Sequence, residues 1–107
     1  MKIKFLGTSA SEGWPAVFCR CERCARAREL GGKNIRTRTS ALIDDILKID
    51  FPPDTYHHVL QHGLNLAQVE HLLFTHSHRD HLYPDDLNTR LRGYAEGVET
   101  PLHIYGN

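Results

Sequence analysis

Four side chains of the types that bind metal ions crowd into the six residues "HSHRDH". The stretch directly follows the apolar run "LLF", which predicts a buried strand. In an extended strand end, residues two apart project to the same side, so His76 and His78 can chelate one ion. A tight turn then brings Asp80 and His81 around a second ion. Imidazole and carboxylate ligands together suit zinc, manganese or iron, and paired ions that lower the pKa of water indicate hydrolysis.

Two other interpretations of this stretch compete with a metal site at a strand end. On a helix, His76 and Asp80 are four residues apart and His78 and His81 three, so a helix also gathers them. The apolar run before them and Pro84 after them favour a strand-to-loop transition. A solvated surface loop is the remaining interpretation, but this density of ligand types behind a buried strand favours a metal site.

A second group of metal-binding side chains has the spacing Cys19-x-Cys21-x-x-Cys24. Three thiolates this close can face one ion, and a fourth ligand would complete a tetrahedral structural zinc site. The neighbouring Arg20 and Arg23 favour the thiolate forms. Three cysteines cannot form a closed disulfide set, so the alternative is a group of reduced, partly buried thiols.

Length and charge limit the partners that this chain can recruit. With 107 residues and no net charge, it is one domain at most and has no overall field that attracts nucleic acid or a membrane. Residues 20–38, however, include seven basic residues and only two acidic ones. This segment predicts either a local anionic ligand or a solvated helix face. No signal peptide or membrane-length apolar run is present, so we expect a soluble cytoplasmic protein without a membrane partner.

The residues predict an alternation of strands and helices. Strands are expected at 2–6, on both sides of a turn at Asp44-Asp45, at 69–74 with both faces covered, and at 101–107. Helices are expected at 22–30, at 52–63, and from Pro84 onward. On the second helix, Tyr56, Val59 and Leu60 form the predicted buried face, which places His58 and His62 on the surface. This order indicates the α/β class.

The pattern "HSHRDH" resembles the H-x-H-x-D-H signature of the metallo-β-lactamase superfamily. The resemblance implies an αββα sandwich in which His76 and His78 bind the first metal, and Asp80 and His81 the second. It also implies that Asp50 supports a ligand histidine by a hydrogen bond, although a turn cap is an equal alternative. The superfamily's later ligands have no counterpart here. We therefore expect residues 1–107 to be a single partial domain, roughly the N-terminal half, with an incomplete active site.

A narrower resemblance rests on "FLGTSASEGWP", the three cysteines and "LKID", which together look like the phosphodiesterase branch of that superfamily. This branch includes an enzyme of phosphonate breakdown that opens a cyclic phosphate on ribose. It implies a small or cyclic phosphodiester substrate, two catalytic zinc or manganese ions, and a structural zinc on Cys19, Cys21, Cys24 and a later histidine. Asp80 would orient the attacking hydroxide while ligating the second ion.

Three alternatives remain open at this stage. One is an endonuclease of the same superfamily that matures the 3′ end of transfer RNA; the cysteines and the lack of a glycine soon after His81 argue against it. A non-catalytic zinc-dependent module that binds nucleic acid through the basic segment is the second. The third is an inactive remnant whose open sheet face is covered by another chain, as in a homodimer.

Overall fold

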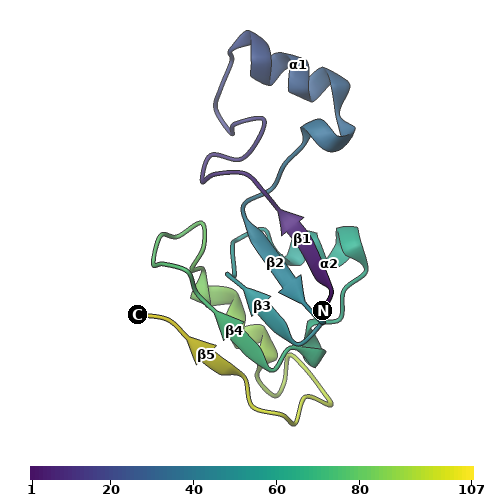
Figure 1. Cartoon of the computed structure of the whole chain (residues 1–107), viewed down its shortest axis with the longest axis vertical. Helices are drawn as coiled ribbons and strands as arrows, with labels where there is room; N and C mark the ends of the chain where they lie inside the picture. The colour runs from purple at the N-terminus through teal and green to yellow at the C-terminus, as the bar shows by residue number, and fades with distance from the viewer.

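The computed structural model describes residues 1–107 and contains one five-stranded sheet (Figure 1). Its elements are β1 (Ile3–Gly7), α1 (Glu22–Leu30), η1 (Gly32–Asn34), β2 (Ser40–Ile43), β3 (Leu47–Ile49), α2 (Thr55–His62), η2 (Leu66–Gln68), β4 (His71–Leu73), η3 (Pro84–Arg90) and β5 (His103–Tyr105). The strands lie in chain order. The β1–β2 and β2–β3 pairs are antiparallel, whereas β3–β4 and β4–β5 are parallel. The predicted α/β class and order of elements are confirmed.

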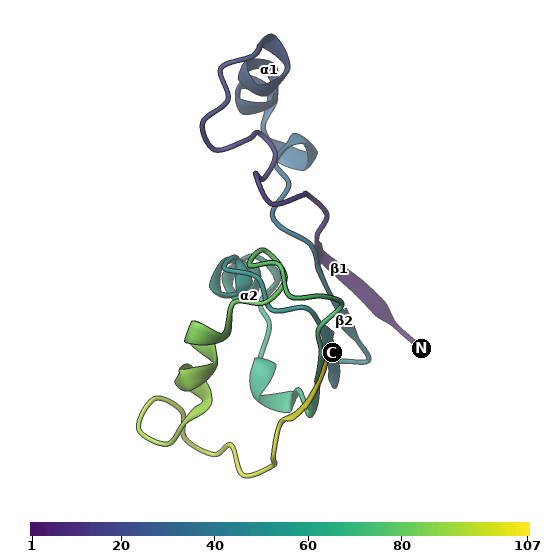
Figure 2. The same cartoon turned by 90° about the vertical axis from the view of Figure 1, so that its left-hand side faces the viewer.

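The sheet is covered on one face only. Helix α2 and the segment that contains η3 lie on the same side of it (Figure 2). A small core formed by Leu6, Leu42 and Val69 lies on this covered side. On the other side Phe5 is 70% exposed and Leu73 is 37% exposed. The prediction that both faces of the 69–74 strand are covered is therefore wrong, because no segment within residues 1–107 packs against the second face.

Helix α2 buries a different face from the one that its apolar residues predict. Tyr56 is 69% exposed and Leu60 64%, whereas His58 is fully buried. The Nε2 atom of His58 lies 2.7 Å from Thr37 Oγ1, and burial lowers the pKa of this histidine to about 4. A neutral, hydrogen-bonded imidazole is acceptable in an interior. The surface prediction for His58 is wrong, while His62 remains partly exposed.

Helix α1 lies at the tip of an arm, formed by residues 8–38, that extends away from the sheet (Figures 1 and 2). Bridges between Ser9 and Arg38 and between Trp14 and Arg36 join the two sides of the arm at its base. The helix ends at Leu30, because Gly31 after it adopts a φ of 58° that suits glycine, so the predicted range 22–30 is confirmed.

The short helix expected from Pro84 onward is present. It is the 3-10 helix η3, which ends with a bond from the Leu91 N–H to the Asn88 carbonyl. Asp85 and Asp86 occupy its first turn. Among all the helices of the structure, none combines the length and the hydropathy that a bilayer crossing requires.

Candidate metal centre

The four predicted ligands lie together in the loop that follows β4. The strand ends at Leu73, and the chain continues without helix through the histidines. The ring centroids of His76 and His78 are 4.7 Å apart, and those of His76 and His81 are 4.0 Å apart. Asp80 Oδ2 lies 3.2 Å from His81 Nε2. The strand-to-loop interpretation is confirmed and the helical one is excluded.

Asp50 anchors this loop from the neighbouring strand. It follows β3 in the left-handed region, with φ 59°, and its side chain is 1% exposed. Its Oδ2 lies 2.6 Å from His81 Nδ1, and its Oδ1 accepts a bond from the Thr75 N–H at 2.8 Å. This hydrogen bond to a candidate ligand histidine matches the supporting role that the resemblance implies. The strained backbone of Asp50 therefore serves to aim its carboxylate.

The same contacts determine which ring nitrogens are free. A carboxylate accepts only, so His81 Nδ1 donates to Asp50. The Thr75 hydroxyl donates its single proton to Asp50 and lies 3.0 Å from His76 Nδ1, which can donate to it. These contacts leave Nε2 of each ring to face a metal ion, and Nε2 of His81 lies 3.2 Å from the Asp80 carboxylate, the other candidate ligand of the same ion.

This donor set fits divalent metal ions. Asp80 is buried at 9% exposure, whereas His76 and His78 are open to solvent, so the site combines a shielded carboxylate with accessible imidazoles. Two ions would receive two ligands each from this chain, fewer than the three protein ligands of a typical catalytic zinc.

The cysteines form the tightest ligand group in the structure. The sulfur atoms of Cys19, Cys21 and Cys24 all lie within 4.8 Å of one another, and none of the three is in a disulfide. The backbone N–H of Cys24 donates to Cys21 Sγ at 3.4 Å. This bond, together with bonds from the neighbouring thiols, lowers the pKa of Cys21 to about 7. A thiolate is therefore accessible near neutral pH, which suits a structural zinc.

We expect the cysteine group to hold one zinc ion. Replacing Cys21 with serine should remove one zinc per chain, because only two of the three thiolate ligands remain. Native mass spectrometry of the protein and of this variant measures the change. A variant at Ser11, which lies outside the group, serves as the control: Ser11→Ala should keep its zinc. An unchanged zinc count in Cys21→Ser would contradict this assignment.

A cleft of about 760 Å³ opens beside Asp80. Its walls come from four parts of the chain: the loop at residues 11–19, the base of the arm, the segment between β3 and α2, and residues 79–83 in and after the histidine loop. They contribute Ser11, Glu12, Ala16, Val17, Phe18, Cys19, Arg38, Pro53, Arg79, Asp80 and Tyr83. Cys19 thus belongs both to the thiol group and to the cleft wall, so the two candidate metal sites border one space.

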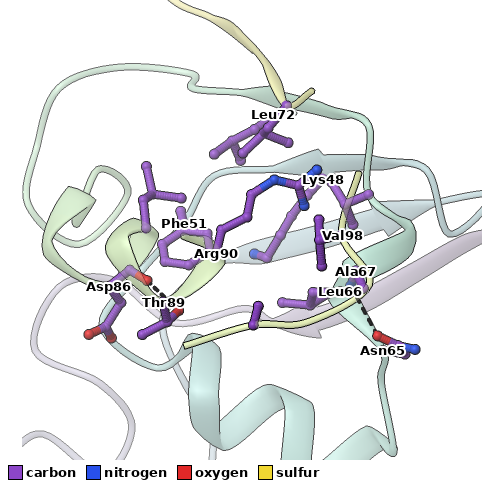
Figure 3. Close-up of a pocket in the computed structure, with 14 residues that line it drawn as sticks. Lys48, Phe51, Asn65, Leu66, Ala67, Leu72, Asp86, Thr89, Arg90 and Val98 are labelled. Atoms are coloured by element: carbon purple, nitrogen blue, oxygen red, sulfur yellow. Dashed lines mark hydrogen bonds between the residues drawn. The ribbon is translucent and has the colours of Figure 1, made fainter. Parts of the chain in front are cut away.

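Lys48 is a supporting residue that the sequence reasoning missed. Its side chain is fully buried, and Nζ donates to Ser40 Oγ at 2.6 Å and to the Asp50 carbonyl at 2.7 Å. It lines a separate cavity of about 280 Å³ on the helix-covered side of the sheet, where Figure 3 shows it beside Phe51 and Arg90. Through the Asp50 backbone, Lys48 braces the residue that anchors His81.

The burial of Lys48 predicts a dependence of stability on pH. Desolvation lowers the pKa of Lys48 to about 7, although Asp50 opposes the shift. Between about pH 7 and pH 10 the unfolded chain keeps a proton that the folded chain has lost. The free energy of unfolding should therefore rise with pH in this window, by up to ~1.4 kcal/mol per unit.

Chemical denaturation at several pH values measures this slope. The matched control is Lys48→Met, which removes the titrating group; all other groups, including the thiols, remain in both proteins. The free energy of unfolding should rise more steeply with pH in the wild type than in Lys48→Met, by up to ~1.4 kcal/mol per pH unit. Parallel curves for the two proteins would show that Lys48 does not titrate in this window.

The sequence contains a signal for the supporting role of Lys48 but none for that of Thr75. A lysine inside the apolar run "ILKID" is unusual for a buried strand and is a usable signal. Thr75 carries no such signal, because a threonine at a strand end is ordinary. Arg79, between two of the histidines, is exposed and lines the cleft.

Comparison with known proteins finds curated sequences that are similar to this chain. No family model matches it. It is similar to ribonuclease Z of Staphylococcus epidermidis, with 27% identity over 106 residues, and to ribonuclease Z of Staphylococcus aureus, with 29% identity over 108 residues. Each match covers 99% of this chain and 30% of the relative. The chain thus spans less than a third of the length of these curated relatives.

Two solved structures share its fold. A new diphosphatase from the PhnP family matches 98% of this chain and 41% of its own, with a TM-score of 0.72 and 27% identity. Zn²⁺-bound PqqB from Methylobacterium extorquens matches 76% of this chain and 31% of its own, with a TM-score of 0.65 and 24% identity. The second likeness concerns the fold alone.

Proposed function

Because this chain has the metallo-β-lactamase fold, as part of such a domain, we propose that the protein is a metal-dependent hydrolase of small or cyclic phosphodiesters. The chain covers a minority of each relative, so the activity is assigned to the whole protein that contains these residues. The similar PhnP-family structure is a diphosphatase, which supports hydrolysis at a phosphate group.

One observation carries the proposal: Asp80, which lies 3.2 Å from His81 in the histidine loop, lines a cleft that also contains two arginines. Imidazoles and a shielded carboxylate are the ligands of hydrolytic metal sites. Guanidinium groups pair with phosphate oxygens. The combination matches a phosphodiester better than an uncharged substrate.

Each residue has a defined part in this chemistry. When bound, paired divalent ions lower the pKa of coordinated water and supply a nucleophile near neutral pH. His76 and His78 hold one ion, and Asp80 and His81 the other. Asp50 fixes the ring of His81, and Asp80 orients the attacking water. Hydrolysis adds water across one P–O bond and gives a phosphomonoester and an alcohol.

Zinc and manganese both suit the imidazole and carboxylate ligands. Zinc is favoured by the cysteine group, which would hold a separate structural ion. We therefore assign two catalytic zinc or manganese ions and one structural zinc to the complete protein.

A second candidate is a ribonuclease, because the curated relatives bear that name. Comparing a cyclic nucleotide diester with a precursor transfer RNA as substrates of the metal-loaded protein separates the two. We expect turnover of the cyclic diester that a chelator abolishes, with the precursor intact. Cleavage of the precursor alone would support the ribonuclease, and turnover of neither would refute the proposed hydrolase.

A further inference from the structure

The cleft beside Asp80 has an aromatic wall that hydrolysis of a phosphate ester does not require. Val17 and Phe18 line it, and they are 62% and 96% exposed. A nearly bare phenyl ring contributes nothing to the core of this chain. The lining also includes Arg38, at the base of the arm, and Arg79, which belongs to the histidine loop. The cleft therefore contains both an exposed apolar ring and two cationic side chains.

Phe18 is exposed but not loosely attached. The loop that carries it is closed by bonds from the Val17 N–H to the Glu12 carbonyl at 3.0 Å and from the Cys19 N–H to the Ala16 carbonyl at 3.1 Å. Arg28 of helix α1 also donates to the carbonyls of Ala16 and Cys19, at 3.0 and 2.9 Å. The backbone on both sides of Phe18 is thus held in place, which reduces the ordering cost of binding a ligand against it.

The cationic wall is arranged to receive an anion. Asp54 holds Arg38 by its Nη2 at 3.0 Å, while Nε of Arg38 is buried without a hydrogen-bond partner. Arg79 is exposed and forms no ion pair. Glu12 also lines the cleft, and its negative charge repels a phosphate. A bound phosphate is therefore favoured near the arginines.

We propose that this cleft binds a nucleotide, with its phosphate toward Arg38 and Arg79 and its base stacked on Phe18. This inference rests on the proposed function, and it narrows the substrate class to phosphodiesters that carry a nucleobase. The volume of about 760 Å³ lies within the range of about 300–1,000 Å³ typical of small-molecule sites. A bare cyclic phosphate would leave the phenyl ring unused.

Adenosine 5′-monophosphate and ribose 5-phosphate test the inference, since they differ only in the base. The phosphomonoester resembles a hydrolysis product and is not itself a diester, so binding to the zinc-loaded protein can be measured by NMR titration. We expect the nucleotide to bind more tightly by about 5- to 150-fold, the range for stacking one base on an aromatic side chain. Phe18→Ala should lower its affinity to that of ribose 5-phosphate and leave the sugar phosphate unaffected.

Two matched controls locate the effect. Phe5→Ala removes another exposed phenyl ring, on the uncovered sheet face, and should change neither affinity. Arg79→Gln should weaken both ligands equally, whereas Arg26→Gln, at an exposed position on α1, should weaken neither.

Equal affinity of the two ligands, or unchanged nucleotide binding in Phe18→Ala, would overturn the inference. Hydrolysis of bis(p-nitrophenyl) phosphate by the same preparation reports on the proposed function separately. Turnover of that diester without any base preference would refute the nucleotide site alone. Base-dependent binding without turnover of any diester would refute the hydrolase and keep the site.

Discussion

Replacing Asp80 with alanine is expected to lower phosphodiester hydrolysis by about 10²–10⁴-fold, the range for losing a positioned group that handles a proton. The side chain is 12% exposed and lies 3.2 Å from His81 Nε2, so both groups face the same point. Its loss removes a ligand of the second ion and the group that orients the attacking water. Initial rates of diester hydrolysis by metal-loaded protein measure the effect.

The fold should survive this substitution, because the only ion pair or side-chain hydrogen bond of the Asp80 carboxylate is the contact with His81. Asp85→Ala, which removes an exposed carboxylate five residues away in η3, is the matched control and should keep full activity. An Asp80→Ala protein that is folded and fully active would remove Asp80 from the site.

Replacing Asp50 with asparagine should weaken binding of the second ion by about 10- to 100-fold, as is usual when a partner of a ligand histidine is lost. The asparagine amide would donate toward His81 Nδ1 and thereby favour the tautomer whose Nε2 carries the proton, which cannot bind a metal. Because Asn tolerates the left-handed region, the backbone at φ 59° need not change. Zinc titration and the ¹⁵N shifts of the His81 ring report affinity and tautomer.

Asp45 offers a control with the same backbone requirement. It also lies in the left-handed region, at φ 62°, but is exposed in the β2–β3 turn. Asp45→Asn should leave both zinc affinity and the His81 spectrum as in the wild type. If Asp50→Asn also behaves as the wild type, the hydrogen bond to His81 is not needed to prepare the ligand.

Local sequence patterns predicted the elements well where backbone chemistry dominates. Gly31 and Gly63 end the two α-helices, and the turn at Asp44-Asp45 separates β2 from β3, because these residues adopt the positive φ values that the turns require. The strand before "HSHRDH" was likewise predictable from its apolar run. The predicted end of that strand was enough to place the four candidate ligands in a loop.

Which side chains are buried was less predictable, because burial depends on the elements that pack against each face of the helix or sheet. The apolar residues of α2 indicated the wrong face: Tyr56 and Leu60 are exposed, and His58 fills the interior through its bond to Thr37. The periodicity of one short helix carries no information about such a polar contact. The support of His81 by Asp50 and Lys48 was only partly visible, since it joins residues about 30 positions apart in the chain.

The central claim is that the histidine loop holds metal ions. Anomalous diffraction at the zinc edge, from crystals of zinc-loaded protein, tests it most directly. We predict peaks at about 2.0–2.1 Å from Nε2 of His76 and of His81, besides one peak among the three cysteine sulfurs. A well-loaded crystal with zinc at the cysteines alone, and with no peak near the histidines, would contradict the account.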